Sequence, residues 1–399
     1  MEQVIELRGN LIKENILKVI DTTVRKYHGK YRILEINVGE SPEKDSTAKV
    51  IIDVEDASFQ SVIDDLRKLG IDIPNILEEP TLKPSLKDKT VPDDFYSTTN
   101  HPTEVYLNGK WVRAQNIRMD AVLVIKDEQV FATKLRDVKK GDLVVCGSKG
   151  VRILNDKFES DEHEFAFMVN DVSSERRVEL AVKELAREIK EIRNRSGKII
   201  VVAGPVVIHT GGMDAFQDII RKGYISGLLS GNALAVHDIE RDLFGTSLGV
   251  DLDTGKVIKG GHSHHMRAIN AVNKSGSIRE AVEDGTINSG IMYELVKNNV
   301  PFVLAGSIRD DGPLPDTIMD LIEAQAAYAE MIKDADMVIM LSTMLHSIGT
   351  GNMLPSWVKT VCVDINPAVV SKLVDRGSAQ AKGLVTDVGL FLTLLNQHL

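Results

Sequence analysis

"ADMVIMLSTMLHSIGTGNMLP", residues 335–355, runs from an apolar segment into a loop of small polar residues. Residues 337–341 are all hydrophobic, as in a strand that is buried on both faces of a parallel sheet. Four hydroxyl side chains, a histidine and two glycines follow within ten residues. Ligands of open α/β sheets bind in the crevice outside the carboxyl ends of the strands. The stretch therefore predicts a parallel sheet with a binding loop at its edge.

The same pattern recurs over residues 173–399. Hydrophobic runs alternate there with helical segments, beginning with an amphipathic helix over 174–197. The runs include "KIIVVAG" (198–204), "FVLAG" (302–306), "DMVIML" (336–341) and "TVCVD" (360–364). This alternation is typical of a doubly wound, mostly parallel α/β sheet with helices on both faces. We expect the chemistry of the protein to lie in this domain.

Two smaller domains are expected before it. Residues 1–84 have the pattern of a strand, a helix, two strands and a helix, which predicts a small α+β sandwich. This module carries no motif, and we interpret it as a packing or regulatory module. Residues 85–172 contain short strands broken by turns, with the hairpin signal Asn108–Gly109, which predicts a small β-rich domain. Prolines and charges over 78–94 indicate a linker.

Composition excludes several classes of partner. The 58 acidic and 48 basic residues give a formal charge of -10, which provides no electrostatic footprint for nucleic acid. No apolar run of about 18 residues is present, so no membrane span is expected. Cys146 and Cys362 lie in apolar runs, where a thiol is normally inert core. Because the N-terminal segment is charged throughout, we expect a reducing, cytoplasmic setting.

Polar and acidic residues follow six of the predicted strands. They are His209 to Gly212, Asn232 with Ala233, Arg309 to Gly312 with Asp310 and Asp311, Thr343 to His346 with Met344 and Leu345, Asp364, and Asp387 with Val388. Carboxyl ends of parallel strands share one edge of a sheet, so these loops predict a crevice.

A dinucleotide is one candidate ligand for this crevice. The G-x-G-x-x-G fingerprint is missing, which argues against an ordinary Rossmann dehydrogenase. Glycine pairs and helix N-termini can nevertheless bind a pyrophosphate through backbone N–H groups. Asp364, at a strand end, is suited to accept hydrogen bonds from ribose hydroxyls. Asp387 has two interpretations, a contact with adenine or ribose and a helix cap, and the cap is favoured.

A second polar concentration is "GGHSHHMRAIN", residues 260–270. His262, His264 and His265 lack the carboxylate or cysteine partners of known zinc patterns, so we predict no metal. His264 is a candidate general acid or base, because imidazole titrates near neutrality. The simplest alternative is that these residues form the polar start of a helix and take no part in catalysis. Arg118, in the β-rich domain, can clamp a substrate carboxylate, although a surface salt bridge explains it equally well.

Several long motifs resemble one family. They are "NHPTEVYLNGKWVRAQNIRMDAVLVI" (100–125), "AGPVVIHTGG" (203–212), "SGNALAVHDIE" (230–240), "GGHSHHMRAIN" (260–270) and "TMLHSIGTGNMLP" (343–355). The chain is similar, over its whole length, to the family named after the conserved region of lysine-ketoglutarate reductase/saccharopine dehydrogenase bifunctional enzymes. This family includes archaeal-type ornithine cyclodeaminases and the C-terminal part of cyanobacterial arginine-degrading bifunctional enzymes.

The resemblance implies conversion of L-ornithine to L-proline and ammonia, with a tightly held NAD that is returned unchanged. It also implies a Rossmann-like NAD fold of the deoxyhypusine synthase and sirtuin type. The family's NAD contacts would fall on Asn232, Ala233, Asp311, Thr343, Met344, Leu345, His346, Asp364, Asp387 and Val388.

The implied reaction needs groups for the substrate as well. From residue type we assign Arg118 to the substrate carboxylate, His264 to the base and Asp310 to the δ-ammonium group. We also expect a homo-oligomer of closed symmetry, as is common for metabolic enzymes.

Three other functions stay open as interpretations of this sequence. A regulatory protein would bind NAD and an amino acid without releasing ammonia. A net oxidoreductase would accumulate NADH. A sirtuin-like deacylase or a deoxyhypusine synthase would consume NAD and release nicotinamide. Fold analogy alone does not choose among them.

Overall fold

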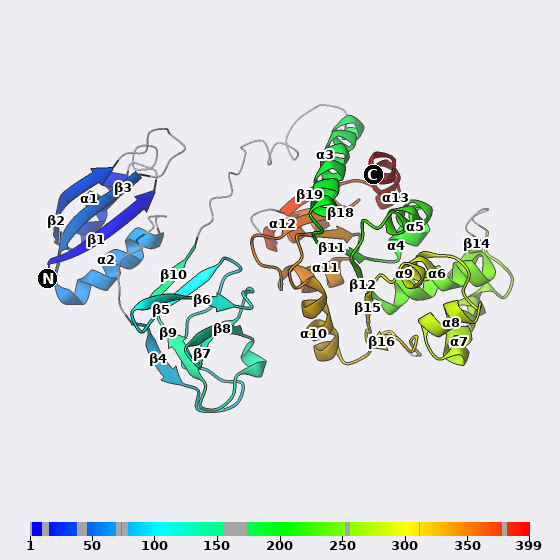
Figure 1. Ribbon diagram of the computed structural model, residues 1–399, viewed down its shortest axis with the longest axis horizontal. Coiled ribbons are helices and arrows are strands. Elements are labelled where there is room, and N and C mark those ends of the chain that lie inside the picture. Colours follow the sequence, from blue (N-terminus) through cyan, green and yellow to red (C-terminus); the bar gives the residue numbers. More distant parts are fainter. Residues whose placement is uncertain are drawn as a thin grey trace. The chain divides into compact units, whose positions relative to one another are not determined.

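The computed structural model describes residues 2–9, 16–37, 46–68, 73, 79–154, 174–251, 256–310, 312–376 and 381–399 (Figure 1). The chain divides into two compact units. The first contains residues 1–96, 103–115 and 122–154, and the second contains residues 97–102, 116–121 and 155–399. The expected domain boundary at residue 172 lies outside the described residues.

The first unit begins with the predicted α+β sandwich. Three antiparallel strands pair in the order β1-β3-β2 and cover the helices α1 and α2. The elements are β1 (Glu2–Gly9), α1 (Ile16–Lys26), β2 (Lys30–Asn37), β3 (Ser46–Asp53) and α2 (Asp56–Lys68). Leu7, Val50, Ile52, Ile20 and Ile63 are fully buried between the sheet and the helices. The order strand, helix, two strands, helix follows the sequence pattern.

The second sheet of this unit corresponds to the predicted β-rich domain and has seven strands, in the order β10-β5-β6-β8-β7-β9-β4. Its strands are β4 (Thr81–Pro84), β5 (Thr103–Leu107), β6 (Lys110–Gln115), β7 (Val122–Lys126), β8 (Gln129–Thr133), β9 (Leu143–Cys146) and β10 (Val151–Ile153). The predicted hairpin forms between β5 and β6, where Asn108 and Gly109 have φ of 51° and 81°.

The predicted linker over residues 78–94 is wrong in one respect, because it contains strand β4. Strand β4 pairs with β9 and is the last strand in the order of the described sheet, so it forms an edge there. Proline is tolerated in an edge strand, where one side of the backbone needs no ladder hydrogen bond. The prolines in this segment therefore do not mark the absence of secondary structure. Because β4 pairs with β9, it belongs with the strands that follow the expected boundary at residue 84.

The second unit is built on a seven-stranded parallel sheet, in the order β16-β15-β12-β11-β17-β18-β19. The strands are β11 (Ile199–Ala203), β12 (Gly227–Gly231), β15 (Phe302–Ala305), β16 (Thr317–Ile318), β17 (Met337–Leu341), β18 (Lys359–Asp364) and β19 (Ala381–Val385). The chain starts at β11, moves outward to β16, and returns to the other side of β11 with β17. The predicted doubly wound α/β fold is confirmed.

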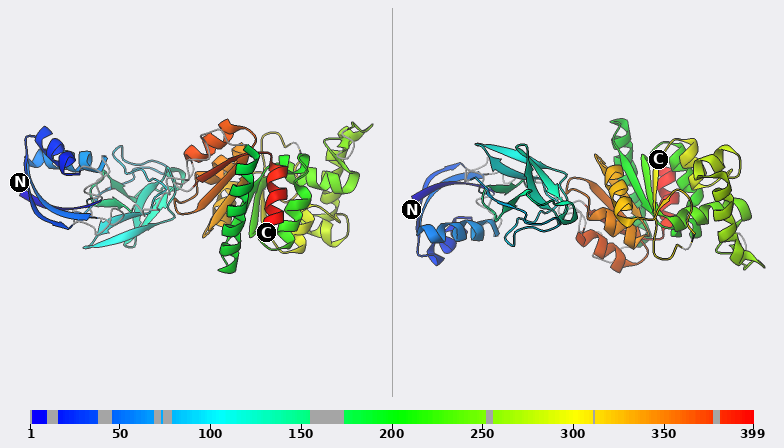
Figure 2. Two further views of the ribbon diagram at one scale, coloured as in Figure 1. Left: turned by 90° about the horizontal axis from the view of Figure 1, so that it is seen from above. Right: turned by 90° about the horizontal axis from the view of Figure 1, so that it is seen from below.

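Helices cover both faces of this sheet (Figure 2). One layer contains α3 (Ser174–Asn194), α5 (Met213–Arg221), α6 (Asn232–Phe244) and α13 (Val388–His398). The other contains α10 (Leu321–Ile332), α11 (Met344–Gly351) and α12 (Pro367–Arg376). Along β11, Ile199 and Val201 face the first layer, whereas Ile200 and Val202 face the second. This two-sided burial explains the unbroken hydrophobic runs.

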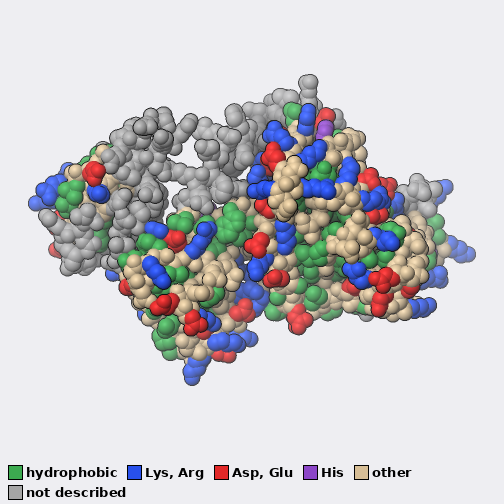
Figure 3. Space-filling model, viewed as in Figure 1, with side chains coloured by type: hydrophobic (Ala, Val, Ile, Leu, Met, Phe, Trp, Pro, Cys, Tyr) green, Lys and Arg blue, Asp and Glu red, His purple; other side chains and the backbone are tan. Residues whose placement is uncertain are grey.

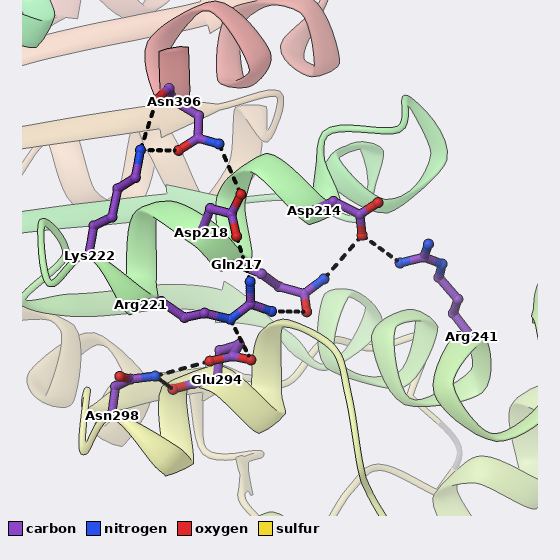
Figure 4. Close-up of polar contacts among 9 residues, drawn as sticks. All are labelled: Asp214, Gln217, Asp218, Arg221, Lys222, Arg241, Glu294, Asn298 and Asn396. Atoms are coloured by element: carbon purple, nitrogen blue, oxygen red, sulfur yellow. Dashed lines mark hydrogen bonds and ion pairs between the residues drawn. The ribbon is translucent and has the colours of Figure 1, made fainter. Parts of the chain in front are cut away.

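A polar network ties α5 to its neighbours in the first layer (Figure 4). Arg221 Nε lies 2.9 Å from Glu294 Oε1 on α9 (Ile291–Lys297), and Asn396 Nδ2 on α13 donates to Asp218 Oδ2 at 3.1 Å. Arg241 on α6 lies 3.5 Å from Asp214. The network holds the helices that flank β11 in place.

Basic and acidic side chains are interspersed on the face of the molecule seen in Figure 3. None of the helices in the described part of the chain is long and apolar enough to cross a bilayer. Cys146 and Cys362 are buried in β9 and β18, as predicted, and both are free thiols. Burial raises the pKa of Cys362 to about 12.

Candidate active site

The winding direction of the sheet reverses between β11 and β17, and the two strands end in contact. Gly204, which follows β11, donates its N–H to the carbonyl of Leu341 at 3.0 Å. A Cβ atom on Gly204 would lie 2.6 Å from the Ser342 carbonyl oxygen. Only glycine fits there without displacing the backbone. In such folds the connections diverge at this point and leave the crevice in which ligands bind.

Asn232 joins the start of α6 to the loop that follows β15. Its Oδ1 accepts hydrogen bonds from Leu314 N and Thr317 Oγ1, both at 3.1 Å, and its Nδ2 donates to Asp310 Oδ1 at 3.3 Å. Asp310 Oδ2 also accepts from Ser307 N at 2.7 Å. Asn232 is only 4% exposed. Two of the predicted site residues, Asn232 and Asp310, are therefore held together.

His346 is oriented by a hydrogen-bonded tyrosine. The Tyr328 hydroxyl donates to the Ser230 carbonyl at 2.6 Å and lies 3.2 Å from His346 Nδ1. Since the hydroxyl has one proton, Nδ1 must be the donor, which leaves Nε2 as an acceptor. Burial lowers the pKa of His346, although the charge of Asp310 opposes this. The ring lies against Gly231, because a Cβ atom on that glycine would be 2.7 Å from Nε2.

The start of α11 has the features of a phosphate site. Thr343 is the N-cap residue of this eight-residue helix and makes no side-chain capping hydrogen bond. Ser347 Oγ and Thr350 Oγ1 are buried on α11 and find no hydrogen-bond partner within the described residues. Buried polar groups normally have partners. Both hydroxyls are fully buried and do not reach a ligand in the crevice, so the uncapped helix end is the feature that fits a polar ligand such as a dinucleotide.

Asp364 and Asp387 lie at the ends of β18 and β19. Asp364 Oδ1 accepts from Asn366 N at 2.8 Å, which leaves Oδ2 for a ligand hydroxyl. Asp387 Oδ1 accepts from Leu390 N at 2.9 Å and caps α13. This is the capping alternative that the sequence favoured. The side chain of Val388 is 1% exposed, so only its backbone is offered to a ligand.

A histidine cluster lies beside α6. We define it as His209, His237 and His265 together with Glu240. Ring centroids are 5.2 Å apart for His209 and His237 and 5.5 Å apart for His237 and His265. Glu240 is fully buried. Burial favours its neutral form, but the imidazole of His237 and the hydrogen bonds that Glu240 accepts from Gly249 N, Thr246 Oγ1 and Leu248 N hold the pKa of Glu240 below its usual range. The cluster thus surrounds a buried anion.

The carboxylate of Glu240 is held by the segment 246–249. Its Oε1 accepts from Thr246 Oγ1 at 2.8 Å and from Gly249 N at 2.9 Å, and its Oε2 accepts from Leu248 N at 3.1 Å. His237 Nδ1 lies 3.8 Å from Oε2 and 3.1 Å from Ser247 Oγ. Tetrahedral zinc ligands lie about 3.4 Å apart and need free lone pairs. One ligand atom of each of His237, Glu240 and His265 lies within 4.8 Å of the others, so these three residues could hold a metal ion. Ser247 already engages His237 Nδ1, and the absence of a metal stays a prediction.

His264 and His265 occupy different surroundings at the start of α7 (His264–Ser275). His264 Nδ1 lies 2.8 Å from Thr246 Oγ1, and its ring stacks on Phe244 at 4.6 Å. His265 Nδ1 instead faces Glu240 Oε2 at 4.0 Å. Burial lowers the pKa of His265, with His237 contributing and with Glu240 and Asp310 opposing. His264 therefore reaches the carboxylate only through Thr246, whereas His265 faces it directly.

Arg118 belongs to the segment 116–121 of the second unit. Its carbonyl accepts from Thr98 Oγ1 at 2.7 Å, and its side chain is half-buried. Nearby in the sequence, the Asn100 carbonyl accepts from Ser356 N at 2.8 Å, in the loop after α11. Segment 97–102 is thus fixed to the loop after α11. Asp311 lies outside the described residues.

Sequence reasoning missed His237, His265 and Glu240 as a group. His237 and Glu240 are three residues apart, which places them on one face of a helix. Both lie in the motif at residues 230–240, and His265 lies in the motif at residues 260–270. The helical spacing of His237 and Glu240 is the signal in the sequence that indicates this group.

Comparison with known proteins agrees with the fold. Residues 183–395 match the family described as "Arginine dihydrolase ArgZ-like, C-terminal, Rossmann fold", and residues 102–182 match the first region of that C-terminal part. Residues 2–101 match the "LOR/SDH bifunctional enzyme conserved region". The ornithine cyclodeaminase of Methanocaldococcus jannaschii is 50% identical over 404 residues, which cover 99% of this chain and 95% of that protein.

Two solved structures are similar as well. An LOR/SDH protein of Methanococcus maripaludis is 51% identical with a TM-score of 0.75, over 80% of this chain and 98% of that one. The ternary complex of AgrE with ornithine and NAD+ is 45% identical with a TM-score of 0.55, over 100% of this chain and 57% of AgrE. Since the family matches span both units and the archaeal relative is covered almost completely, the chain belongs to the ornithine cyclodeaminase family that shares the ArgZ-like C-terminal region.

Proposed function

We propose that this protein converts L-ornithine into L-proline and ammonia by redox-neutral hydride transfer to and from bound NAD. The observation that carries the proposal is the hydrogen bond between Asn232 and Asp310 at the carboxyl ends of the parallel strands, with His346 lying against the neighbouring Gly231. Support comes from the relatives, since AgrE has been solved with ornithine and NAD+ together. When bound, NAD supplies the hydride acceptor for the substrate Cα and the hydride donor for the cyclic imine.

The proposed cofactor contacts follow the strand ends. They are Asn232, Ala233, Asp311, Thr343, Met344, Leu345, His346, Asp364, Asp387 and Val388. The N-terminus of α11 suits a pyrophosphate, because its first N–H groups receive no side-chain cap. The free oxygen of Asp364 suits ribose hydroxyls. Asn232 keeps the neighbouring loop in place through three hydrogen bonds.

Three residues are proposed to act on the substrate. Asp310 would bind the δ-ammonium group, because Ser307 N and Asn232 Nδ2 fix its carboxylate beside the crevice. Arg118 would bind the substrate carboxylate as a bidentate partner. His264 would exchange protons with the amines, with Thr246 linking it to the buried charge of Glu240. All three have the chemistry that the reaction requires.

One incubation tests the proposal. Purified protein with L-ornithine deuterated at Cα and with catalytic NAD should give proline and ammonia in equal amounts, without lasting NADH absorbance. The deuterium should return to Cα of proline, because the same hydride leaves and comes back. Lasting NADH would support a net oxidoreductase, and released nicotinamide would support an NAD-consuming enzyme. Bound NAD without turnover would support a regulatory protein.

We also propose that the enzyme works as a homo-oligomer in the cytoplasm. The two free, buried cysteines are compatible with a reducing setting. Light scattering of the purified protein should give a mass that is a multiple of 44.0 kDa. A monomer mass at working concentration would contradict this part of the proposal.

A further inference from the structure

We propose that His265 is the residue that exchanges a proton with the substrate amine, and that Glu240 is the positioning residue that orients it. This inference rests on the proposed function and deepens it. His265 and Glu240 form a second, buried part of the site, outside the strand-end loops. In this assignment His265, and not His264, is the base.

The geometry of His265 favours this role. Its Nδ1 is buried and has no hydrogen-bond partner within the described residues, and Glu240 Oε2 lies 4.0 Å away. A shift of about 1 Å would close this gap to a hydrogen bond. Catalytic hydrogen bonds are often long without ligand and shorten when substrate binds. A carboxylate facing the Nδ1 of a histidine is the arrangement that fixes its tautomer and stabilises its charged form.

Glu240 has an acceptor position left for this purpose. Its Oε1 accepts two hydrogen bonds, from Thr246 and Gly249, whereas its Oε2 accepts one, from Leu248. The remaining lone pair of Oε2 lies on the side of His237 and His265. A buried carboxylate that served only to hold the segment 246–249 would not need two imidazoles beside it. The position therefore favours a catalytic partner over a purely structural anchor.

Burial, rather than the charges around it, keeps His265 neutral and ready to accept a proton. Glu240 and His237 face it from α6, and His209 on α4 (Val206–His209) follows behind His237. Asp310 acts on it from the loop after β15, and His264 precedes it on its own helix. The two carboxylates stabilise the imidazolium once it forms. Burial and His237 favour the neutral imidazole before then.

The reaction uses such a group twice. His265 takes a proton from the α-ammonium nitrogen, whose lone pair then forms the C=N bond as the hydride leaves Cα for NAD. The δ-ammonium group gives one proton to Asp310, and the resulting δ-amine attacks this carbon and forms the new C–N bond. His265 gives its proton to the α-amine and takes one from the attacking nitrogen, whose lone pair then forms the ring C=N bond as the old C–N bond breaks and ammonia leaves with its electron pair. The hydride returns to the cyclic imine, and the protons held by Asp310 and His265 pass to ammonia and to the ring nitrogen, so protons and electrons balance.

The decisive experiment compares variants of three neighbouring histidines in the full-length protein. His265→Asn should lower kcat about 10²- to 10⁴-fold, the usual contribution of a general base, while the Kd for NAD stays within about twofold. His262→Asn is the matched control, because His262 is exposed in the same segment, and it should keep full activity. Imidazole added to His265→Ala should restore part of the rate, which a structural defect would not allow.

Glu240→Gln tests the positioning role separately. The acidic limb of the kcat–pH profile should move to lower pH if His265 is the base, because Glu240 favours the charged imidazole and its loss lowers the pKa of His265; a profile identical to wild type would overturn the role of Glu240. If this variant does not fold, Thr246→Val, which removes one donor to Glu240, should give a smaller shift of the same limb.

Other outcomes overturn the inference in distinguishable ways. Full activity of His265→Asn, or a loss confined to His264→Asn, would return the base to His264. One equivalent of firmly bound zinc, lost in Glu240→Gln, would make the cluster a metal centre instead. Wild-type protein that makes no proline would overturn the proposed function, and this inference with it. An active wild type with an unaffected His265→Asn would overturn this inference alone.

Discussion

Replacing Gly204 by alanine should disrupt the point at which β11 and β17 meet. The new Cβ atom would lie 2.6 Å from the Ser342 carbonyl oxygen and 3.1 Å from Thr343 Cβ. Ser342 already has a positive φ of 44°, so its backbone has little freedom to move away. Either the two strand ends separate, or the hydrogen bond from Gly204 N to Leu341 O breaks.

The expected cost follows from these two effects. Overpacking a closely packed site costs about 1–3 kcal/mol, and a lost hydrogen bond adds about 1 kcal/mol. The free energy of unfolding of the second unit should therefore fall by about 2–4 kcal/mol. For a unit of this size the melting temperature should fall by about 5–15 °C. The affinity for NAD should fall as well, because the same loops border the crevice.

Tryptophan fluorescence can measure this unit by itself. The chain has two tryptophans, Trp111 in the first unit and Trp357 in the second. In a Trp111→Phe background, the emission of Trp357 reports unfolding of the second unit alone. Gly349→Ala is the matched control, since its Cβ atom would meet nothing within 4 Å in α11, and it should be neutral or slightly stabilising. Equal melting of Gly204→Ala and Gly349→Ala would refute the close contact of β11 and β17.

Three further changes test other parts of the second unit. Arg221→Met leaves the buried carboxylate of Glu294 without its closest cation, so the unit should lose about 1–3 kcal/mol in chemical denaturation, and an unchanged midpoint would contradict the network of Figure 4. Asp238 is fully buried, and burial raises its pKa from 3.8 to about 7 despite hydrogen bonds from Ile291 N and Met292 N. Its folded state binds the proton more tightly than the unfolded chain, so its contribution to stability falls as pH rises from about 4 to about 7; Asp238→Asn should remove this slope from denaturation curves taken at several pH values, and a slope that persists would exclude Asp238 as its source. Tyr328→Phe removes the hydroxyl that fixes His346, so calorimetric titration should give a several-fold weaker affinity for NAD, whereas an unchanged affinity would mean that His346 does not contact the cofactor.

The sequence predicted the parallel sheet well, because its strands are buried on both faces. Residues 199–203 and 337–341 are fully or almost fully buried, and nothing but a continuous apolar run suits that position. It predicted the edge strand β4 poorly, since Thr81–Pro84 is mostly exposed and ends in a proline. An edge strand needs neither a hydrophobic face nor a full set of backbone donors, so its local pattern resembles that of a loop.

The strand-end residues and the histidine cluster also differ in how well the sequence predicts them. Residues at strand ends could be placed from the sequence because the topology of a parallel sheet brings them to one edge, as it does for Asn232 and Asp310. Glu240 was harder to place: its three-residue spacing from His237 puts both on one face of a helix, but a glutamate within a helix ordinarily faces solvent. Its burial depends on the segment 246–249 and on α7 folding over α6, and these contacts are set by packing rather than by local pattern.

Helix α6 connects the two parts of the site mechanically. It begins with Asn232, which fixes the loop that carries Asp310, and it presents Glu240 to His265 eight residues later, about 12 Å along its axis. A redox-neutral cyclisation must return both a hydride and a proton to one bound intermediate, so the groups that handle them need a constant separation. A single buried helix supplies that separation more rigidly than two loops could. A glycine substitution in the middle of α6, at Ala235, should therefore lower kcat more than it lowers the affinity for NAD.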